Sequence, residues 1–379
     1  MKIIVLGAGL VGKAMALDLA SEPGFSLTSV DVKPEALAEL AAAGIKTIQR
    51  NLSQPETISE IVRDYDLVIN AVPGYLGFQS LRACLEAGRK VVDISFFPEN
   101  PLELEPVAKE QKLTAAVDCG VAPGLSNMLA GYGLSQLDQA FSIHIYVGGL
   151  PIIRKWPFEY QAVFSPVDVI EEYLRPARCV ANGQLVTKPA LSEPELIEFE
   201  NLGTLEAFNT DGLRTMIDTL TVPEMIEKTL RYPGHREKML ALRQAGFFDN
   251  QPVEIAGQKI RPVDLAARIL FPRLRPEQGE ADLTVMRVII SGQKGGQPLK
   301  LTYDLFDRFD PQTGIHSMAR TTGYTATAVA RALAQGLIKT TGIVAPECLG
   351  LEPEIFNFVR TELAKRKIVI QEKKEWPES

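Results

Sequence analysis

The feature that most constrains the fold is a glycine turn near the N-terminus, Gly7-Ala8-Gly9-Leu10-Val11-Gly12. An apolar strand pattern over residues 2–6 precedes the turn, and a helical apolar pattern over residues 14–20 follows it. A second strand pattern over residues 26–30 leads to Asp31, which lies 19 positions after the last glycine of the turn. This order of strand, glycine turn, helix, strand and acidic residue predicts a dinucleotide-binding βαβ unit.

The three glycines of the turn have separate physical roles. Gly7 permits the tight turn, Gly9 lets the backbone approach a pyrophosphate, and Gly12 brings the helix close to the strand with its N-terminus toward the phosphates. A carboxylate at Asp31 accepts hydrogen bonds from both ribose hydroxyls and repels a 2′-phosphate, so NAD is favoured over NADP. The alternative interpretation is a glycine-rich turn without a ligand. The cofactor residues predicted here are Gly7, Gly9, Leu10, Val11, Gly12 and Asp31.

The alternation of strand and helix patterns continues and predicts a doubly wound parallel sheet, the α/β Rossmann fold, over residues 1–120. In such a sheet, ligands collect at the carboxyl ends of the strands. The loop after strand 66–70 and the strand-end residues Asp93 and Asp118 are therefore expected at the site. The alternative for both carboxylates is that each caps the loop that follows it. The further predicted cofactor residues are Asn70, Ala71, Val72, Pro73 and Asp93.

Beyond this point the βαβ pattern gives way to long alternating strands. We therefore expect a second, α+β domain with a mainly antiparallel sheet over residues 121–319, for substrate binding and dimerisation. Residues 320–350 are expected to return to the first domain, and residues 351–379 to form a helix and a short strand. The expected strands are 66–70, 90–94, 113–117, 141–147, 280–291 and 299–309, and the expected helices are 78–87, 125–137 and 324–335.

Composition excludes several classes of partner. Forty basic against 47 acidic residues give a formal net charge of -7, so no overall positive field exists to hold a nucleic acid. The apolar runs are shorter than the roughly 18 residues of a membrane span, and the N-terminus begins a strand rather than a leader. The four cysteines have neither a CxxC pair nor metal-ligand spacing. We expect a cytoplasmic protein with no metal, no nucleic-acid partner and no membrane partner.

Five motifs together resemble the saccharopine dehydrogenase-like oxidoreductases. The resemblance covers nearly the whole chain and is greatest to the lysine 6-dehydrogenases. It implies oxidation of the ε-amine of L-lysine with NAD, release of ammonia and 2-aminoadipate 6-semialdehyde, and a homodimer. The motifs are the glycine turn, Val-Val-Asp-Ile-Ser at 91–95, Asp-Cys-Gly-Val-Ala-Pro-Gly-Leu at 118–125, Asn-Thr-Asp-Gly-Leu-Arg at 209–214 and Arg-Tyr-Pro-Gly-His at 231–235.

Two departures from the saccharopine reductases bear on the substrate. Those enzymes typically carry a Ser-Tyr pair after the fifth strand and an Asp-Pro-Gly turn in the following loop. This chain has Ser95-Phe96 and Ala122-Pro123-Gly124, and an acid appears four positions before Ala122, as Asp118. The departures argue against saccharopine as substrate and favour the lysine dehydrogenase variant.

Oxidative deamination needs a hydride acceptor, a neutral amine, a base and a water that attacks the iminium. The chain contains three histidines, His144, His235 and His316. We rank the candidate bases as Asp118, then His235, then His144, because Asp118 ends a strand near the expected nicotinamide. A histidine on a strand is more often a hydrogen-bonded structural residue, which places His144 last.

The α-carboxylate of an amino acid requires a fixed cation. The planar fork of Arg214 is the first choice, because it binds a carboxylate at two points. Thr210 and Asp211 are expected to hold the α-ammonium or to orient the loop, and the alternative for all three residues is a helix N-cap at Asp211. A second polar cluster over 231–235 has the alternative of an exposed turn.

Three functions remain open from the sequence. The first is NAD-dependent oxidation of the ε-amine of a lysine-like amino acid. The second is an imine-reducing dehydrogenase of the saccharopine or carboxynorspermidine type, using NAD or NADP. The third, a non-catalytic NAD sensor, would leave Asp118, Arg214 and His235 without a purpose.

Overall fold

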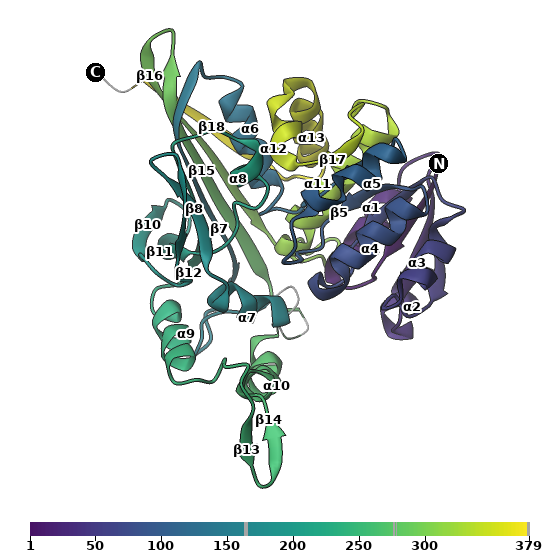
Figure 1. The fold of residues 1–379 in the computed structure, drawn as a ribbon, viewed down its shortest axis with the longest axis horizontal. Coiled ribbons are helices and arrows are strands. Elements are labelled where there is room, and N and C mark those ends of the chain that lie inside the picture. The colour runs from purple at the N-terminus through teal and green to yellow at the C-terminus, as the bar shows by residue number, and fades with distance from the viewer. Residues whose placement is uncertain (163–165, 276, 278, 377–379) are drawn as a thin grey trace.

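The computed structural model describes residues 1–162, 166–275, 277 and 279–376. Two sheets organise the chain, and Figure 1 shows the N-terminal sheet with its helices on one side and a larger sheet on the other. The first sheet is parallel and the second is mixed and mainly antiparallel. The predicted fold class is confirmed.

In the part of the chain described, the first sheet has seven parallel strands in the order β17-β6-β5-β4-β1-β2-β3. Ile3 and Val5 of β1 join the apolar cluster on one face, and Ile4 and Leu6 join the cluster on the other. A strand that is apolar on both faces needs helices on both faces, which gives the doubly wound arrangement. The bounds are β1 (Lys2–Leu6), α1 (Leu10–Ala20), β2 (Ser26–Asp31), α2 (Pro34–Ala42), β3 (Lys46–Gln49), α3 (Pro55–Val62), β4 (Leu67–Asn70), α4 (Gly74–Glu86), β5 (Lys90–Asp93), the 3-10 helix η1 (Pro101–Leu104), α5 (Glu105–Glu110), β6 (Thr114–Ala116) and β17 (Gly342–Val344).

One edge strand of this sheet comes from far along the chain. β17 pairs in parallel with β6, where Gly342 lies opposite Thr114 and Val344 opposite Ala116. The segment 320–350 thus contributes a strand to the first sheet. The tail 351–379 contributes a strand to the second sheet, because β18 pairs with β16.

The second sheet, counted over the described residues, has nine strands, with the order β10-β11-β12-β7-β15-β16-β18; in addition β8 pairs with β12, and β9 pairs with β8. β7 is its centre, since it pairs in parallel with β12 and antiparallel with β15. The bounds are β7 (Gln139–Pro151), α7 (Pro166–Leu174), β8 (Ala177–Ala181), β9 (Gln184–Lys188), β10 (Glu195–Phe199), β11 (Gly203–Asn209), α8 (Met216–Thr219), β12 (Glu224–Arg231), β15 (Asp282–Lys294), β16 (Gln297–Arg308) and β18 (Ile370–Glu375).

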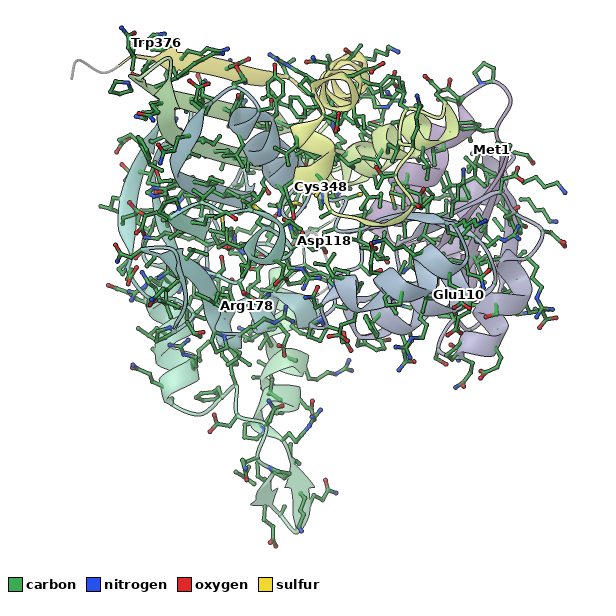
Figure 2. All side chains as sticks on the ribbon, turned by 45° about the horizontal axis from the view of Figure 1, so that its top comes forward. Met1, Glu110, Asp118, Arg178, Cys348 and Trp376 are labelled. Carbon is green, nitrogen blue, oxygen red and sulfur yellow. The ribbon has the colours of Figure 1, made fainter. Side chains whose placement is uncertain are left out.

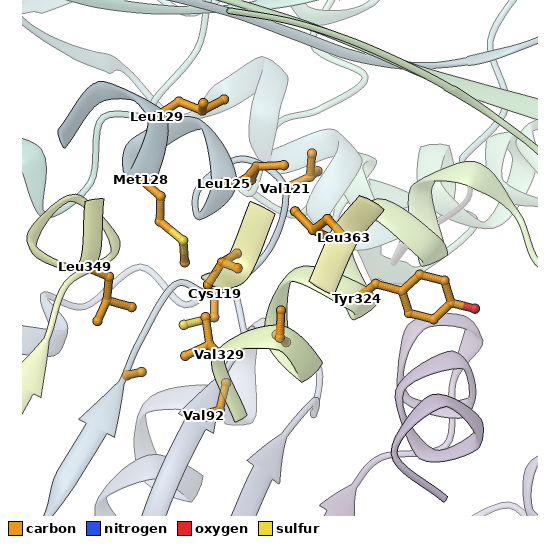
Figure 3. Close-up of a cluster of buried hydrophobic side chains, with 14 of the residues drawn as sticks. Val92, Cys119, Val121, Leu125, Met128, Leu129, Tyr324, Val329, Leu349 and Leu363 are labelled. Atoms are coloured by element: carbon orange, nitrogen blue, oxygen red, sulfur yellow. The ribbon is translucent and has the colours of Figure 1, made fainter. Parts of the chain in front are cut away.

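A layer of helices fills the space between the two sheets, where Figure 3 shows their apolar side chains gathered in one cluster. Helices α6 and α12 approach each other closely because each has a glycine where it meets the other. A Cβ on Gly131 of α6 would lie 2.1 Å from the carbonyl oxygen of Glu347, and one on Gly350 would lie 2.0 Å from that of Met128. The layer consists of α6 (Leu125–Leu134), α11 (Ser317–Ala334), α12 (Pro346–Leu351) and α13 (Pro353–Lys365).

Two helices begin earlier than the sequence pattern predicts. The expected loop 71–74 ends in Gly74, which is already the first residue of α4. Likewise α11 begins at Ser317 rather than at residue 324, so Thr321, Thr322 and Gly323 are helical. Gly323 packs closely on α1, because its Cβ would lie 3.1 Å from the Met15 side chain.

An arm projects from the second sheet at the end away from the C-terminal strand (Figure 1). It consists of α9 (His235–Gln244), the hairpin β13 (Val253–Ile255) and β14 (Gln258–Ile260), and α10 (Pro262–Leu274). Among the described residues, no helix combines the length and the apolar character that crossing a bilayer requires.

Candidate active site

A cavity of about 1370 Å³ lies between the two parts of the molecule. The glycine turn, the ends of β2 and β4 and the start of α4 line one half. The ends of β7 and β12 and the segment before α11 line the other half. Asp118 also lines the cavity and lies where the chain passes between the two parts (Figure 2). The cavity therefore joins a nucleotide groove to a second chamber.

The glycine turn fits a pyrophosphate group. A Cβ on Gly7, whose φ is +101°, would lie 2.5 Å from the carbonyl oxygen of Ala71, and a Cβ on Gly12 would lie 2.1 Å from that of Gly7. A Cβ on Gly9 would meet nothing within 4 Å, so the backbone borders open space there, before the N-terminus of α1. Two glycines are thus required by packing, and the third leaves room for a ligand. The predicted cofactor residues that line the cavity are Gly7, Gly9, Leu10, Val11, Gly12, Asp31, Ala71, Val72 and Pro73.

Asp31 sits at the rim of the cavity as an acceptor of two backbone hydrogen bonds. Ala8 N donates to its Oδ2 at 2.8 Å and Lys33 N donates to its Oδ1 at 2.9 Å. Each oxygen keeps a lone-pair direction for a ribose hydroxyl. Lys33, Asn51 and Ser53 also line the cavity. These polar neighbours were not predicted, because the motif reports only the acidic residue.

Asn70 and Asp93 lie beneath the cavity rather than on its described lining. Both are fully buried, and Asn70 Nδ2 donates to Asp93 Oδ2 at 2.6 Å. Ser95 N donates to Asp93 Oδ1 at 2.6 Å, and Ser80 of α4 donates to Asn70 Oδ1 at 2.8 Å. Burial raises the pKa of Asp93 to about 8. This network joins β4, β5 and α4, so these two residues support the cofactor half from below.

Asp118 and Arg214 form a buried ion pair. Arg214 Nε donates to Asp118 Oδ2 and Arg214 Nη2 to Asp118 Oδ1, both at 3.1 Å, and Arg214 Nη1 donates to the carbonyl oxygen of Phe97 at 2.7 Å. Asp118 lines the cavity, whereas Arg214 is not among the described residues that do. The structure thus directs the guanidinium that was predicted for a substrate carboxylate toward Asp118 instead.

The two candidate histidines lie away from the cavity. His235 is 1% exposed, and its ring nitrogens contact the hydroxyl of Tyr173 at 2.9 Å and the carbonyl oxygen of Phe158 at 2.8 Å. Burial lowers the pKa of His235 to about 3. His144 is half-buried on β7 beside Tyr146, and burial lowers its pKa. Neither belongs to the described lining, because packing holds one inside a core and strand alternation turns the other away.

Thr210 and Asp211 are engaged with protein partners. Arg178 donates to both carboxylate oxygens of Asp211, at 2.9 and 3.0 Å. The hydroxyl of Thr210 donates to Glu227 at 2.6 Å and contacts the hydroxyl of Thr229 at 2.9 Å. Of these residues, Thr229 is on the described lining of the cavity. Thr210 therefore supports the lining from behind.

One face of β12 brings polar groups to this side of the sheet. Glu227, Thr229 and Arg231 alternate along the strand, so their side chains share a face, and the three residues are 4%, 5% and 3% exposed. Thr229 and Arg231 line the cavity. The sequence signal was the alternation Glu-Lys-Thr-Leu-Arg over 227–231, which places polar residues at the buried positions of a strand.

Of the three histidines, His316 alone is found on the described lining of the cavity. It precedes α11, and its Nε2 lies 3.1 Å from the carbonyl oxygen of Glu280. The ring makes an edge contact with Phe309, which also lines the cavity. Sequence reasoning did not rank it, because no pattern around residue 316 indicated its place.

Two family models match almost the entire chain. The model of the saccharopine dehydrogenase C-terminal domain matches residues 120–369, and the model of the saccharopine dehydrogenase NADP binding domain matches residues 3–116. The chain belongs to the saccharopine dehydrogenase family. The predicted family is thereby confirmed.

Curated relatives agree with this family at low identity. The yeast Saccharomyces cerevisiae saccharopine dehydrogenase [NADP(+), L-glutamate-forming] is 24% identical over 274 residues, 68% of this chain and 61% of the relative. The bovine mitochondrial alpha-aminoadipic semialdehyde synthase is 23% identical over 65% of this chain and 28% of the relative. This chain therefore spans less than two thirds of either relative.

A solved structure shows the same fold. Apo saccharopine dehydrogenase (L-Glu forming) from Saccharomyces cerevisiae superposes with a TM-score of 0.81 at 20% identity, over 99% of each chain.

In this saccharopine dehydrogenase-family chain, Phe96 and Ala122 both line the cavity. The guanidinium carbons of Arg175 and Arg214 lie 5.0 and 5.1 Å from the centre of the Phe96 ring. Phenylalanine and alanine supply no acid or base, so Asp118 is the ionisable group that this region offers to the cavity.

Proposed function

We propose that this chain oxidises the ε-amine of L-lysine, or of a close analogue, and releases 2-aminoadipate 6-semialdehyde and ammonia. When bound, NAD accepts a hydride from the ε-carbon of the substrate. The resulting iminium takes up water at the same carbon, and the C–N bond then breaks to give the aldehyde and ammonium. One proton is released for each turnover.

The surroundings of Asp118 carry this proposal. Asp118 lines the cavity together with Phe96 and Ala122, which supply no acid or base. The substrate half also holds both signs of charge on its described lining, the carboxylates of Glu172 and Glu277 and the guanidiniums of Arg231 and Arg275, which suits a zwitterionic amino acid such as lysine.

Asp118 is the group that receives the ε-amine of the substrate. Its two oxygens are held by Arg214, and each keeps a lone-pair direction that can accept from an ammonium at the cavity surface. Because the carboxylate is held by two bonds, it can orient the amine over the cofactor half and accept its proton. Phe96 and Ala122 keep this region apolar, which favours the neutral amine that hydride loss requires.

NAD is proposed over NADP because Asp31 lies at the rim of the cavity, where its carboxylate can accept hydrogen bonds from the ribose hydroxyls and would repel a 2′-phosphate. The matched family model is named for NADP, and Lys33 lies on the same rim. The choice of cofactor is therefore a point on which this chain is proposed to differ from the yeast relative.

A saccharopine-type dehydrogenase is the second candidate, and it is favoured by the names of the relatives. The deciding experiment measures absorbance at 340 nm with lysine or saccharopine and with NAD or NADP, and identifies the nitrogen product. Ammonium formed from lysine supports the proposal. Glutamate formed from saccharopine, with lysine inert, would assign the second function.

A further inference from the structure

Helix α11 lies alongside α1 and runs in the same direction. A Cβ on Gly323 of α11 would lie 3.5 Å from the Val11 side chain of α1, and further along both segments Arg331 Nε donates to Glu22 Oε2 at 2.7 Å. Helix α11 begins six residues before Gly323, whereas α1 begins one residue before Val11. At about 1.5 Å per residue, α11 starts roughly 7 Å beyond the start of α1. Residues 313–316, which precede α11, accordingly line the same cavity as the glycine turn.

The start of α11 lies on one particular side of the glycine turn. In the order of the first sheet, β2 with Asp31 is on one side of β1, and β4, β5 and β6 are on the other. Helix α11 contacts β4 and β5, and a Cβ on Gly120, which follows β6, would lie 3.3 Å from the Thr322 side chain. A dinucleotide held by Asp31 at its adenine ribose crosses the glycine turn and brings its nicotinamide half to the β4–β6 side. The start of α11 is therefore beside the nicotinamide half.

His316 immediately precedes α11 and presents a ring nitrogen that a ligand can reach. Its Nε2 lies 3.1 Å from the carbonyl oxygen of Glu280, which can only accept, so Nε2 carries a hydrogen. Nδ1 has no hydrogen-bond partner among the described atoms, and it is not one of the side-chain atoms that are both unpaired and buried. In the neutral ring Nδ1 is an acceptor. Because His316 lines the cavity, a ligand there can donate to this atom.

The surroundings of His316 favour a hydroxyl over a phosphate as its partner. Asp282 accepts from the backbone nitrogens of Ser317 and Met318 at 2.7 and 3.0 Å, so the first amides of α11 are already bonded. The carboxyl of Asp282 is also close enough to His316 for the two to interact electrostatically. A phosphate at this place would lack those amides as donors and would meet an acidic side chain. A hydroxyl donates to Nδ1 without adding negative charge.

We infer that Nδ1 of His316 accepts a hydrogen bond from a hydroxyl of the nicotinamide ribose of the cofactor. The second half of the chain then takes part in cofactor binding, in addition to the glycine turn and Asp31. The inference goes beyond the proposed function, because it concerns the cofactor alone and is the same whether lysine or saccharopine is oxidised.

Three ligands divide the cofactor on either side of this ribose. NADH contains both riboses and the nicotinamide ring, ADP-ribose lacks the ring, and ADP lacks the ring and the second ribose. Calorimetric titration gives Kd for each ligand without any substrate. For His316→Gln we expect Kd for NADH and for ADP-ribose to rise roughly three- to tenfold, the usual effect of losing one hydrogen bond, and Kd for ADP to stay within about twofold of wild type.

A second variant separates the two ring nitrogens. The amide of glutamine reaches the position of Nε2 and can still donate to Glu280, whereas the amide of asparagine lies near the position of Nδ1 and can still accept. His316→Asn should therefore bind NADH and ADP-ribose more tightly than His316→Gln does. His144→Gln is the matched control, because His144 of β7 is half-buried and is absent from the described lining of the cavity. Its three Kd values should equal those of wild type.

Other patterns of affinity would overturn the inference. Equal losses for all three ligands would mean that the substitution disturbs the whole nucleotide groove, and a loss for NADH alone would place His316 against the nicotinamide ring. A greater loss in His316→Asn than in His316→Gln would assign the effect to the bond with Glu280, and unchanged Kd values in both variants would show that there is no contact. Thermal melting reports folding. If His316→Gln does not fold, His316→Phe, which keeps a ring beside Phe309, replaces it and is judged by the same contrast between ADP-ribose and ADP.

Discussion

Asp118 and Arg214 form a two-point ion pair in which both residues have left-handed backbone conformations, with φ of 51° and 52°. A non-glycine residue in this region costs roughly 1–2 kcal/mol. Two such residues facing each other show that the surrounding fold over-determines their positions. The carboxylate of Asp118 is thus held at a fixed place on the cavity wall.

Asp118→Asn tests the proposed role of this carboxylate. We expect kcat to fall by about 10² to 10⁴, the usual contribution of a positioned base, and Kd for NADH to stay near wild type. If the variant keeps more than about a third of wild-type kcat, Asp118 is not the base.

The same substitution should lower stability, because it leaves the buried Arg214 guanidinium without its anion. Removal of one partner of a buried pair typically costs about 3–5 kcal/mol. Asp307→Asn is the control, because Asp307 pairs with Arg320 at a similarly buried position that is absent from the described lining. It should lower Tm without the loss of kcat.

Arg214→Lys tests whether this residue meets the substrate. Because Arg214 holds Asp118, lysine and cadaverine turnover should fall by similar factors, mainly in kcat. Steady-state kinetics with both amines measures this. A rise in KM for lysine alone would show that Arg214 binds the α-carboxylate of the substrate.

Asp31→Ala tests the choice of cofactor. Each hydrogen bond to a charged acceptor is worth about 1.5–3 kcal/mol, so Kd for NADH should rise roughly tenfold or more, while NADPH should bind more tightly. Fluorescence titration with both cofactors gives the values. Lys33→Ala, made in the wild-type background, is the companion variant. If it loses more affinity for NADPH than for NADH, the chain is an NADP enzyme.

Stability should depend on pH through two buried carboxyls. Burial raises the pKa of Asp93 from 3.8 and that of Glu227 from 4.5, both to about 8. Between these values the folded chain keeps protons that the unfolded chain has lost, so the free energy of unfolding falls as pH rises. The contribution is full below about pH 4 and is lost above about pH 8.

Urea unfolding between pH 6.5 and 9 measures this slope, which is at most about 1.4 kcal/mol per pH unit for each group. Below pH 6.5 the lowered pKa of the buried His235 acts in the opposite direction. Asp93→Asn and Glu227→Gln should each reduce it. Asp64→Asn, at an exposed position, should not. A slope that is the same in all four proteins would show that neither buried carboxyl retains its proton.

The cofactor half could be predicted because its signal is local. The turn from Gly7 to Gly12 and the acidic residue Asp31 are fixed by the geometry of one βαβ unit, and the structure places them around one cavity. Asn70 and Asp93 lie outside the described lining of the cavity. The position of a residue at a strand end does not reveal whether its side chain points toward the cavity or toward α4.

The substrate half could not be predicted in the same way. Whether Arg214 faces the ligand or Asp118 depends on contact between segments 96 residues apart. His235 is buried against Tyr173, away from the cavity, and no local sequence pattern shows this contact. The sequence placed Arg231 in a polar cluster with an exposed turn as the alternative, because the position of Arg231 on the cavity wall depends on how the second sheet meets the first.

β17 has a consequence for how the chain is made. The first sheet lacks this edge strand until residues 342–344 have left the ribosome, by which time the segments of the second sheet up to β16 have already been synthesised. The nucleotide domain cannot be completed by its N-terminal residues alone, and until β17 arrives β6 presents an open edge. Folding of the two domains during translation is therefore interleaved rather than sequential, and an N-terminal fragment ending near residue 120 is expected to aggregate through that edge.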